Sequence, residues 1–177
     1  LLTGHGFETL DAWTGLGGNC QNISIESADW GADSKYGEKA LRMCSVEEGA
    51  TKNGVEQLTA TLPAGQYTFS AYLLIAASFK GGTTPGAYIR VVSTGGSVLA
   101  VSERLTTFDR EYVRLIVPFT LASAQRVKVQ ILVDGAGTVY ADGAQLENNP
   151  YANAYNLLEN GNFERGTSGW TIGNGIS

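Results

Sequence analysis

The sequence predicts an all-β fold, specifically a two-sheet β-sandwich. Apolar and polar residues alternate with a period of two in several short segments, which is typical of strands with one buried face. The 177-residue chain contains 23 glycines, and this excess, without a collagen-like period, indicates many tight turns. No segment shows the spacing of an amphipathic helix. The length suits one domain with its own core.

The expected strands follow one another along the chain, and several are bounded by glycine or proline. The turn at residues 62–66, Leu-Pro-Ala-Gly-Gln, introduces one alternating segment, and the turn at residues 81–86 introduces the next. Short strands at this spacing are typical of a two-sheet sandwich. In order, we expect strands at residues 4–8, 23–26, 40–46, 54–62, 67–73, 87–92, 112–117, 127–133 and 139–146.

Composition and motifs exclude several functional classes. The formal net charge is −5, from 12 basic and 17 acidic residues, which argues against a nucleic-acid partner because phosphate binding needs concentrated Lys and Arg. The longest apolar run, residues 71–77, is far below the roughly 20 residues of a membrane-spanning helix. The only histidine is His5, and the sequence contains no Gly-x-Ser-x-Gly, His-Glu-x-x-His or Gly-x-x-x-x-Gly-Lys motif. We therefore expect no catalytic activity and no membrane span.

The opening of the chain is repeated near its end. Residues 1–8, Leu-Leu-Thr-Gly-His-Gly-Phe-Glu, are followed by Trp13-Thr14 and recur as residues 157–164, Leu-Leu-Glu-Asn-Gly-Asn-Phe-Glu, followed by Trp170-Thr171. The repeat predicts a module over residues 1–147, a polar linker over residues 148–156 and the start of a second, truncated copy over residues 157–177. We therefore expect a piece of a longer protein, with adjacent modules of the same polypeptide as partners.

The two cysteines, Cys20 and Cys44, permit one disulfide or two buried thiols. The sequence leaves both alternatives open. Two thiols are too few to form a zinc site by themselves.

Several short motifs occur in a fixed order along residues 1–147. Their order and spacing resemble the galactose-binding-like β-jelly-roll modules, in particular carbohydrate-binding modules of the family 4, 9 and 22 type. Similar modules occur in tandem in large surface proteins of Gram-positive anaerobes, so the resemblance implies an extracellular or cell-surface bacterial protein. The motifs are Gly4-His5-Gly6-Phe7-Glu8, Trp13, Tyr36-Gly37-Glu38-Lys39-Ala40-Leu41-Arg42-Met43, residues 62–72, and the closing Val139-Tyr140-Ala141-Asp142-Gly143-Ala144-Gln145-Leu146-Glu147.

The resemblance implies one structural Ca²⁺ ion. Modules of this type commonly hold it between the opening strand, the loop before the third strand and the closing strand. Carboxylates and loop carbonyls supply the oxygen ligands that Ca²⁺ prefers. The alternative is that the two strand carboxylates only cap turns or pair with Lys39 or Arg42. The residues that match the metal positions are Glu8, Asp29, Asp33, Lys35, Gly37 and Asp142.

Sugar binding is the second implication of the resemblance. Sugars are bound by flat aromatic faces and by planar polar side chains that bracket their hydroxyls. In the expected strands, one face carries the apolar residues and the opposite face collects tyrosines and polar side chains. The alternative is that these are ordinary solvated cross-strand pairs. We expect one sheet surface to bind the glycan, made of Tyr72, Tyr88, Arg90, Tyr112, Arg114, Lys128 and Gln130.

We therefore expect a non-catalytic module that binds a polysaccharide or another glycan. The alternative is a structural spacer or adhesion module of a multidomain surface protein, which contacts protein neighbours and binds no sugar. An open sheet with coplanar Tyr72, Tyr88 and Tyr112 would favour sugar binding, whereas a face covered by a loop or by residues 157–177 would favour the spacer.

Overall fold

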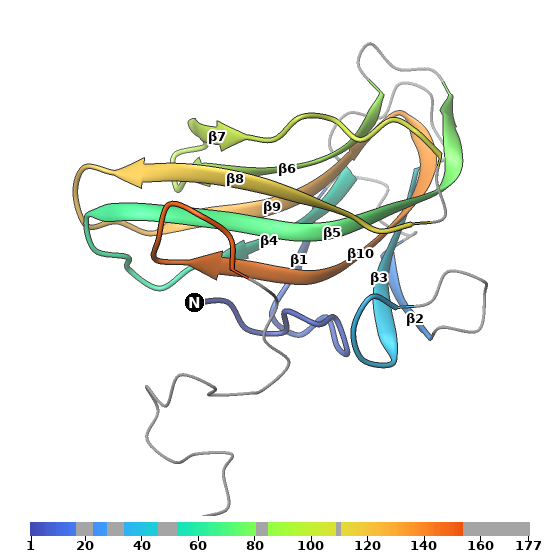
Figure 1. Cartoon of the computed structure of the whole chain (residues 1–177), viewed down its shortest axis with the longest axis horizontal. Helices are drawn as coiled ribbons and strands as arrows, with labels where there is room; N and C mark the ends of the chain where they lie inside the picture. Colours follow the sequence, from blue (N-terminus) through green and yellow to red (C-terminus); the bar gives the residue numbers. More distant parts are fainter. Residues whose placement is uncertain (17–22, 28–33, 46–52, 81–84, 109–110, 154–177) are drawn as a thin grey trace, which may run out of the picture.

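A computed structural model describes residues 1–16, 23–27, 34–45, 53–80, 85–108 and 111–153 of the chain. This described part contains ten β-strands and no helix (Figure 1). The strands are β1 (Thr14–Leu16), β2 (Ile23–Ser27), β3 (Lys39–Ser45), β4 (Asn53–Leu58), β5 (Gly65–Lys80), β6 (Gly86–Ser93), β7 (Val98–Val101), β8 (Val113–Leu121), β9 (Val127–Asp134) and β10 (Ala136–Glu147).

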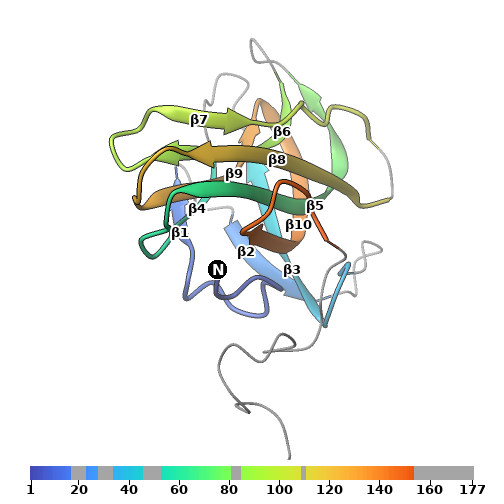
Figure 2. The same ribbon diagram turned by 60° about the vertical axis from the view of Figure 1, so that its left-hand side comes forward.

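The strands form two sheets of five strands each. The first sheet has the order β1-β4-β9-β6-β7, and the second sheet has the order β2-β3-β10-β5-β8. All neighbouring strands are antiparallel. Among these strands, only β2 and β3, and β6 and β7, follow each other within one sheet, and every other connection changes sheet. The two views show the sheets stacked as layers (Figures 1 and 2). The predicted two-sheet β-sandwich is confirmed.

The core lies between the two sheets. In the first sheet, Val55, Ile131 and Ile89 stand side by side on neighbouring strands, and each is at most 1% exposed. The second sheet contributes the inward side chains of β5 and β10, among them Phe69 and Val139. Because side chains alternate between the two faces of a strand, the intervening residues point outward. The two outer faces are therefore the surfaces on which these strands can display polar groups.

The expected strand at residues 4–8 is wrong, because this segment forms turns. Phe7 has a φ of 50°, and its fully buried ring lies 5.1 Å from the ring of Trp13. The indole Nε1 of Trp13 donates to the carbonyl of Gly4 at 3.0 Å, and the N–H of Ala144 on β10 donates to the carbonyl of His5 at 2.9 Å. Aromatic packing thus holds the opening segment against the core, although the segment does not pair with a neighbouring strand.

Two short strands at the edges of the first sheet have no counterpart among the expected strands. β1 has three residues and β7 has four, which is too short for a period of two to become visible in the sequence. The expected strand at residues 54–62 also stops early, at Leu58. Beyond it, Leu62 pairs with Gln125 in an isolated bridge.

The described part of the predicted linker is attached to the second sheet. The hydroxyl of Thr68 donates to the carbonyl of Asn149 at 2.8 Å, and Nη1 of Arg114 donates to the carbonyl of Asn153 at 2.5 Å. The side chain of Glu147 accepts the backbone N–H of Asn153 at 3.0 Å. Residues 148–153 therefore return across the outer face of the second sheet.

Some predictions concern residues outside the described part. These are the second copy at residues 157–177, the metal ligands Asp29 and Asp33, and the pairing of Cys20 with the side chain of Cys44.

Gly54 tests the close approach of β4 and β9. It lies opposite Leu132, and a Cβ at this position would collide with the carbonyl oxygen of Ile131 and come within 2.9 Å of the Leu132 Cα. Both are backbone atoms, so the strands would have to separate. We expect Gly54→Ala to lower the free energy of unfolding by about 1–3 kcal/mol, measured by urea denaturation.

The matched control is Gly95→Ala, because a Cβ at Gly95 meets only the Ser93 hydroxyl at 3.8 Å. We expect this variant to stay within about 0.5 kcal/mol of the original chain. Equal stability of the two variants would contradict the close approach.

Candidate functional site

The predicted glycan-binding surface is divided between two opposite faces of the sandwich, so the prediction of one shared surface is wrong. The alternation of side chains indicates that a residue points outward, but it does not indicate which sheet its strand joins. β5 and β6 are consecutive in sequence and yet belong to different sheets. The first sheet carries Tyr88, Arg90, Lys128 and Gln130, whereas the second sheet carries Tyr72, Tyr112 and Arg114.

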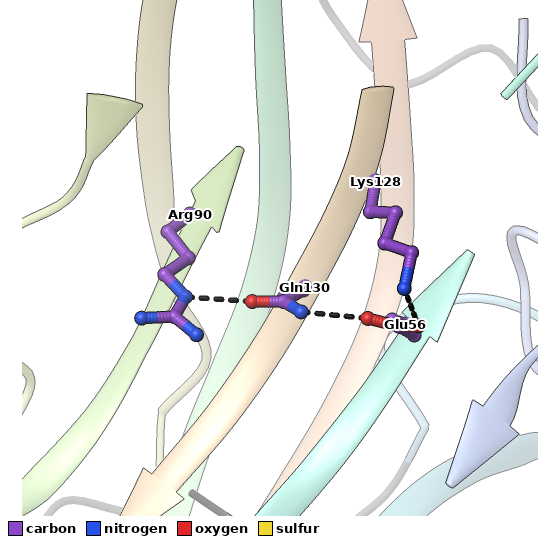
Figure 3. Close-up of polar contacts among 4 residues, drawn as sticks. All are labelled: Glu56, Arg90, Lys128 and Gln130. Atoms are coloured by element: carbon purple, nitrogen blue, oxygen red, sulfur yellow. Dashed lines mark hydrogen bonds and ion pairs between the residues drawn. The ribbon is translucent and has the colours of Figure 1, made fainter. Parts of the chain in front are cut away.

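A hydrogen-bonded row of four side chains crosses the outer face of the first sheet (Figure 3). Gln130 on β9 lies between Glu56 on β4 and Arg90 on β6. Its Oε1 accepts a hydrogen bond from Arg90 Nε at 2.6 Å, and its Nε2 donates to Glu56 Oε2 at 2.6 Å. Lys128 Nζ completes the row with an ion pair to Glu56 Oε1 at 2.7 Å. We call these four residues the polar row.

The polar row keeps unused hydrogen-bonding groups. Within the described residues, Arg90 uses only its Nε, so both terminal nitrogens are free, and no dashed line reaches them in Figure 3. Lys128 uses one of its three N–H groups on Glu56. The row can therefore donate to a ligand at two places.

Apolar side chains flank the polar row on both sides. On β7, Val101 pairs in register with Arg90 and is 55% exposed, and Val98 nearby is also exposed. On β4, Leu58 pairs with Lys128 and is 41% exposed. The face thus combines fixed polar groups with exposed apolar surface.

Tyr88 lies on the same face, but its ring is covered. The guanidinium of Arg104 lies 4.0 Å from the ring centre, and Tyr88 is only 4% exposed. Arg104 is itself paired with Asp134 at 2.7 Å. Burial, and then the charge of Asp134, raise the pKa of Tyr88. Tyr88 is therefore a packed side chain and does not offer an open ring face.

On the second sheet, Tyr72 is surrounded by side chains of the same molecule. Tyr36 meets it edge-on at 5.5 Å between ring centres. Lys35 and Arg114 lie 5.3 and 5.4 Å from the centre of the Tyr72 ring. Burial, and then the hydrogen bond with Tyr72, raise the pKa of Tyr36 to about 12.

Arg114 and Tyr112 also have internal roles. Arg114 donates to Ser70 Oγ at 3.0 Å, to Gln145 Oε1 at 2.8 Å and to the carbonyl of Asn153. Tyr112 packs against a small cluster of Ala40, Leu74 and Tyr140 on the outer face. Residues 148–153 add contacts to Thr68 and Arg114 on the same face.

The predicted metal positions in the described part, Glu8, Lys35, Gly37 and Asp142, come together. Glu8 Oε1 accepts the backbone N–H groups of Glu38 at 2.9 Å and Lys39 at 3.3 Å, and a Cβ on Gly37 would collide with it. Asp142 Oδ2 accepts the N–H of Tyr36 at 2.7 Å.

In these bonds the two carboxylates accept backbone N–H groups, as in the alternative interpretation that they cap turns. Glu8, however, lies in a turn and not in an opening strand. Its contacts nevertheless join the start of the chain to the segment before β3, and those of Asp142 join β10 to the same segment.

Asp142 is an acidic residue in a buried position, and its pKa is raised. Its side chain is fully buried, and Oδ1 accepts the N–H of Gly143 at 2.6 Å. Burial raises the pKa of Asp142 to about 7, against the opposing effect of its backbone hydrogen bonds, and the charge of Glu8 raises it further. Within the described residues, neither Glu8 nor Asp142 forms an ion pair, with Lys39, with Arg42 or otherwise.

A cavity of about 420 Å³ lies elsewhere, between the N-terminal residues and the connection from β4 to β5. Gln57 fixes one wall by accepting the N–H of Thr3 at 3.0 Å and donating to its carbonyl at 2.8 Å. None of the predicted site residues lines this cavity.

Two further features bear on the class of protein. In the part of the chain that the structure describes, no three His, Cys, Asp or Glu side chains gather into a group that could hold a metal ion. The same residues include no helix long and apolar enough to cross a membrane.

Glu56 and Arg104 belong to the candidate face, although the sequence did not single them out. Glu56 falls in an expected strand, next to the inward-facing Val55. The alternation of side chains along the strand therefore already indicates that Glu56 points outward. Its partnership with Lys128 and Gln130 needed the pairing of β4 with β9. Arg104 follows β7 and approaches Tyr88 only because β7 lies beside β6.

Comparison with known proteins identifies the fold. No protein-family model matches the chain, and no curated protein does. Among solved structures, a family 61 carbohydrate-binding module in complex with β-1,4-galactotriose is 19% identical, with a TM-score of 0.60 over 84% of this chain and 97% of that one.

Two other structures are similar. A family 16 carbohydrate-binding module is 20% identical, with a TM-score of 0.59 over 83% of this chain and 99% of that one. The CBM22-1 and GH10 modules of the Clostridium thermocellum endo-1,4-β-D-xylanase 10B, complexed with xylohexaose, are 13% identical, with a TM-score of 0.59 over 81% of this chain and 28% of that one. The chain thus has the β-sandwich fold of carbohydrate-binding modules.

Proposed function

We propose that this protein is a non-catalytic module that binds a glycan on the outer face of the first sheet. The observation that carries the proposal is the polar row, in which Glu56, Gln130, Arg90 and Lys128 fix one another across three strands. Planar amide, carboxylate and guanidinium groups held in this way are the groups that bracket sugar hydroxyls. The similar folds in complex with galactotriose and xylohexaose support the same class of ligand.

The surroundings of the polar row suit a sugar chain. The C–H surfaces of a sugar pack against apolar side chains, and exposed Val98, Val101 and Leu58 supply these on both sides of the row. Arg90 and Lys128 keep free N–H groups on this face, and the Lys128 side chain is 33% exposed. Donors held rigidly before binding reduce the entropy lost when a ligand is ordered.

The outer face of the second sheet is a poorer candidate. Arg114 is committed to Ser70, Gln145 and Asn153, and the Tyr72 ring is in contact with its own neighbours. A glycan would have to displace these internal contacts to reach either residue. The first sheet presents its unused donors without such a displacement.

We also propose that one Ca²⁺ ion binds where the opening segment, the segment before β3 and the closing strand meet. Glu8 and Asp142 are two uncompensated carboxylates that bind neighbouring parts of one backbone segment. Asp142 is fully buried, and a nearby cation would lower the cost of ionising a carboxylate in such a position. An all-oxygen set of these carboxylates and the carbonyls around Lys35 and Gly37 fits Ca²⁺, whose role would be structural.

The setting follows from the same proposal. A glycan-binding module would act at the cell surface or outside the cell, and the repeated opening at residues 157–164 supports neighbouring modules in the same polypeptide.

The glycan-binding face is tested by Gln130→Ala, which removes the centre of the polar row. Without Gln130, Arg90 and Glu56 lose their fixed orientation, and we expect retention on a polysaccharide gel to weaken by about tenfold or more. Ile116→Ala on β8, an exposed residue of the second sheet, is the control and should bind as the original chain does. No retention of the original chain on any plant, host or bacterial wall polysaccharide would contradict the proposal.

The calcium site is tested by chelation. We expect EDTA to lower the melting temperature of the original chain and CaCl₂ to restore it, because the ion would join three segments. Glu8→Gln should lose this response, whereas Asp11→Asn, an exposed carboxylate of the same opening segment, should keep it. An unchanged melting temperature, with no metal by elemental analysis, would refute the site.

The pH dependence of the metal-free protein provides a second test. The pKa of Asp142 is raised to about 7 in the folded protein, whereas an unfolded aspartate has a pKa of about 4. Between about pH 4 and pH 7 the folded state therefore binds more protons than the unfolded state, so the free energy of unfolding falls as the pH rises.

We expect EDTA-treated protein to lose stability across this range relative to Asp142→Asn, measured by the two melting temperatures. Parallel curves for the two proteins would show that Asp142 does not carry the effect.

A further inference from the structure

We propose that the polar row selects a glycan that carries a negative charge, and that the free end of Arg90 binds this charge. The inference rests on the proposed function and names the chemical class of its ligand. The anion would be a carboxylate of a uronic acid or a sulfate ester, because both offer two oxygens to a pair of parallel N–H groups.

The charges of the face support this class of ligand. Lys128 is paired with Glu56 and Arg104 is paired with Asp134, each at 2.7 Å. Arg90 has only the neutral amide of Gln130 as its partner among the described residues. The face therefore retains one uncompensated positive charge, in a chain whose formal net charge is −5.

The geometry of Arg90 also suits an anion. Gln130 holds the Nε of Arg90 at 2.6 Å, and Glu56 in turn holds Gln130 at 2.6 Å. This chain of bonds orients the guanidinium, and its two terminal nitrogens have no contact with the other residues drawn (Figure 3). Two parallel donors in a fixed plane match a carboxylate or a sulfate, whereas a lysine ammonium lacks this planar pair.

Two carboxylates of this face, Glu56 and Asp134, are paired with Lys128 and Arg104. The carboxylate in the polar row, Glu56, is neutralised by Lys128. The tyrosine of the face, Tyr88, is covered by Arg104 and is only 4% exposed, so stacking of a neutral sugar on its ring is not available. Polar contacts must therefore provide most of the selectivity, and the strongest unused contact is the cation of Arg90.

The experiment compares matched pairs of polysaccharides by affinity gel electrophoresis and titration calorimetry. The pairs are polygalacturonate and its methyl ester, glucuronoxylan and its carboxyl-reduced form, and a sulfated galactan and its desulfated form. We expect the charged member of at least one pair to bind about tenfold or more tightly than its neutral partner, and this binding to weaken as salt is added. The pair that responds identifies the anion as a carboxylate or a sulfate.

Variants separate the guanidinium pair from charge alone. Arg90→Lys keeps the charge and loses the planar pair of donors, and Arg90→Gln loses both, so we expect progressively weaker binding of the charged polysaccharide. Arg42→Gln on the outer face of the second sheet removes the same charge from the whole chain and should bind normally. Melting temperatures verify that all three variants are folded.

Each outcome has a distinct meaning. Equal or tighter binding of the neutral members would overturn selection of an anion and leave the proposed glycan binding intact. Normal binding by Arg90→Gln would overturn the role of Arg90. Absence of binding to every member of every pair would overturn both proposals together.

Discussion

The register of β9 between β4 and β6 is the constraint on which the rest of the molecule depends. It places Ile131 between Val55 and Ile89 in the core, and on the opposite face it places Gln130 between Glu56 and Arg90. A slip of one residue on β9 would exchange the two sets, turning Gln130 toward the core and Ile131 toward the outer face. The apolar core and the polar row are therefore two consequences of one pairing, and the burial of the core holds the row in position.

The outward polar side chains of the two sheets differ in where they find hydrogen-bond partners. Outward polar groups on the second sheet find partners in the chain itself, since residues 148–153 return to Thr68 and Arg114. On the first sheet, Lys128 and Arg104 are paired internally, but Arg90 is not. The polar groups of the second face are thus bonded within the chain, whereas Arg90 on the first face keeps terminal nitrogens with no partner among the described residues.

The opening segment and the closing strand both bind the backbone of residues 36–39. Glu8 binds the N–H groups of Glu38 and Lys39, and Asp142 binds the N–H of Tyr36. Burial raises the pKa of Asp142 to about 7, because a buried carboxylate is costly when it is ionised. The junction also explains how a segment of turns, rather than a strand, can close the sandwich.

The sequence by itself determined the all-β class, the positions of most strands and the outward direction of Arg90 and Gln130, because these follow from local alternation and turn residues. The family resemblance also predicted that Glu8 and Asp142 lie near one segment, and both carboxylates accept N–H groups from residues 36–39. Only the tertiary structure decided that Tyr72 and Tyr88 lie on opposite faces, that Arg104 covers Tyr88, and that Glu56 completes the polar row. The reason is physical: alternation is a property of one strand, whereas pairing between strands depends on contacts between residues far apart in the chain.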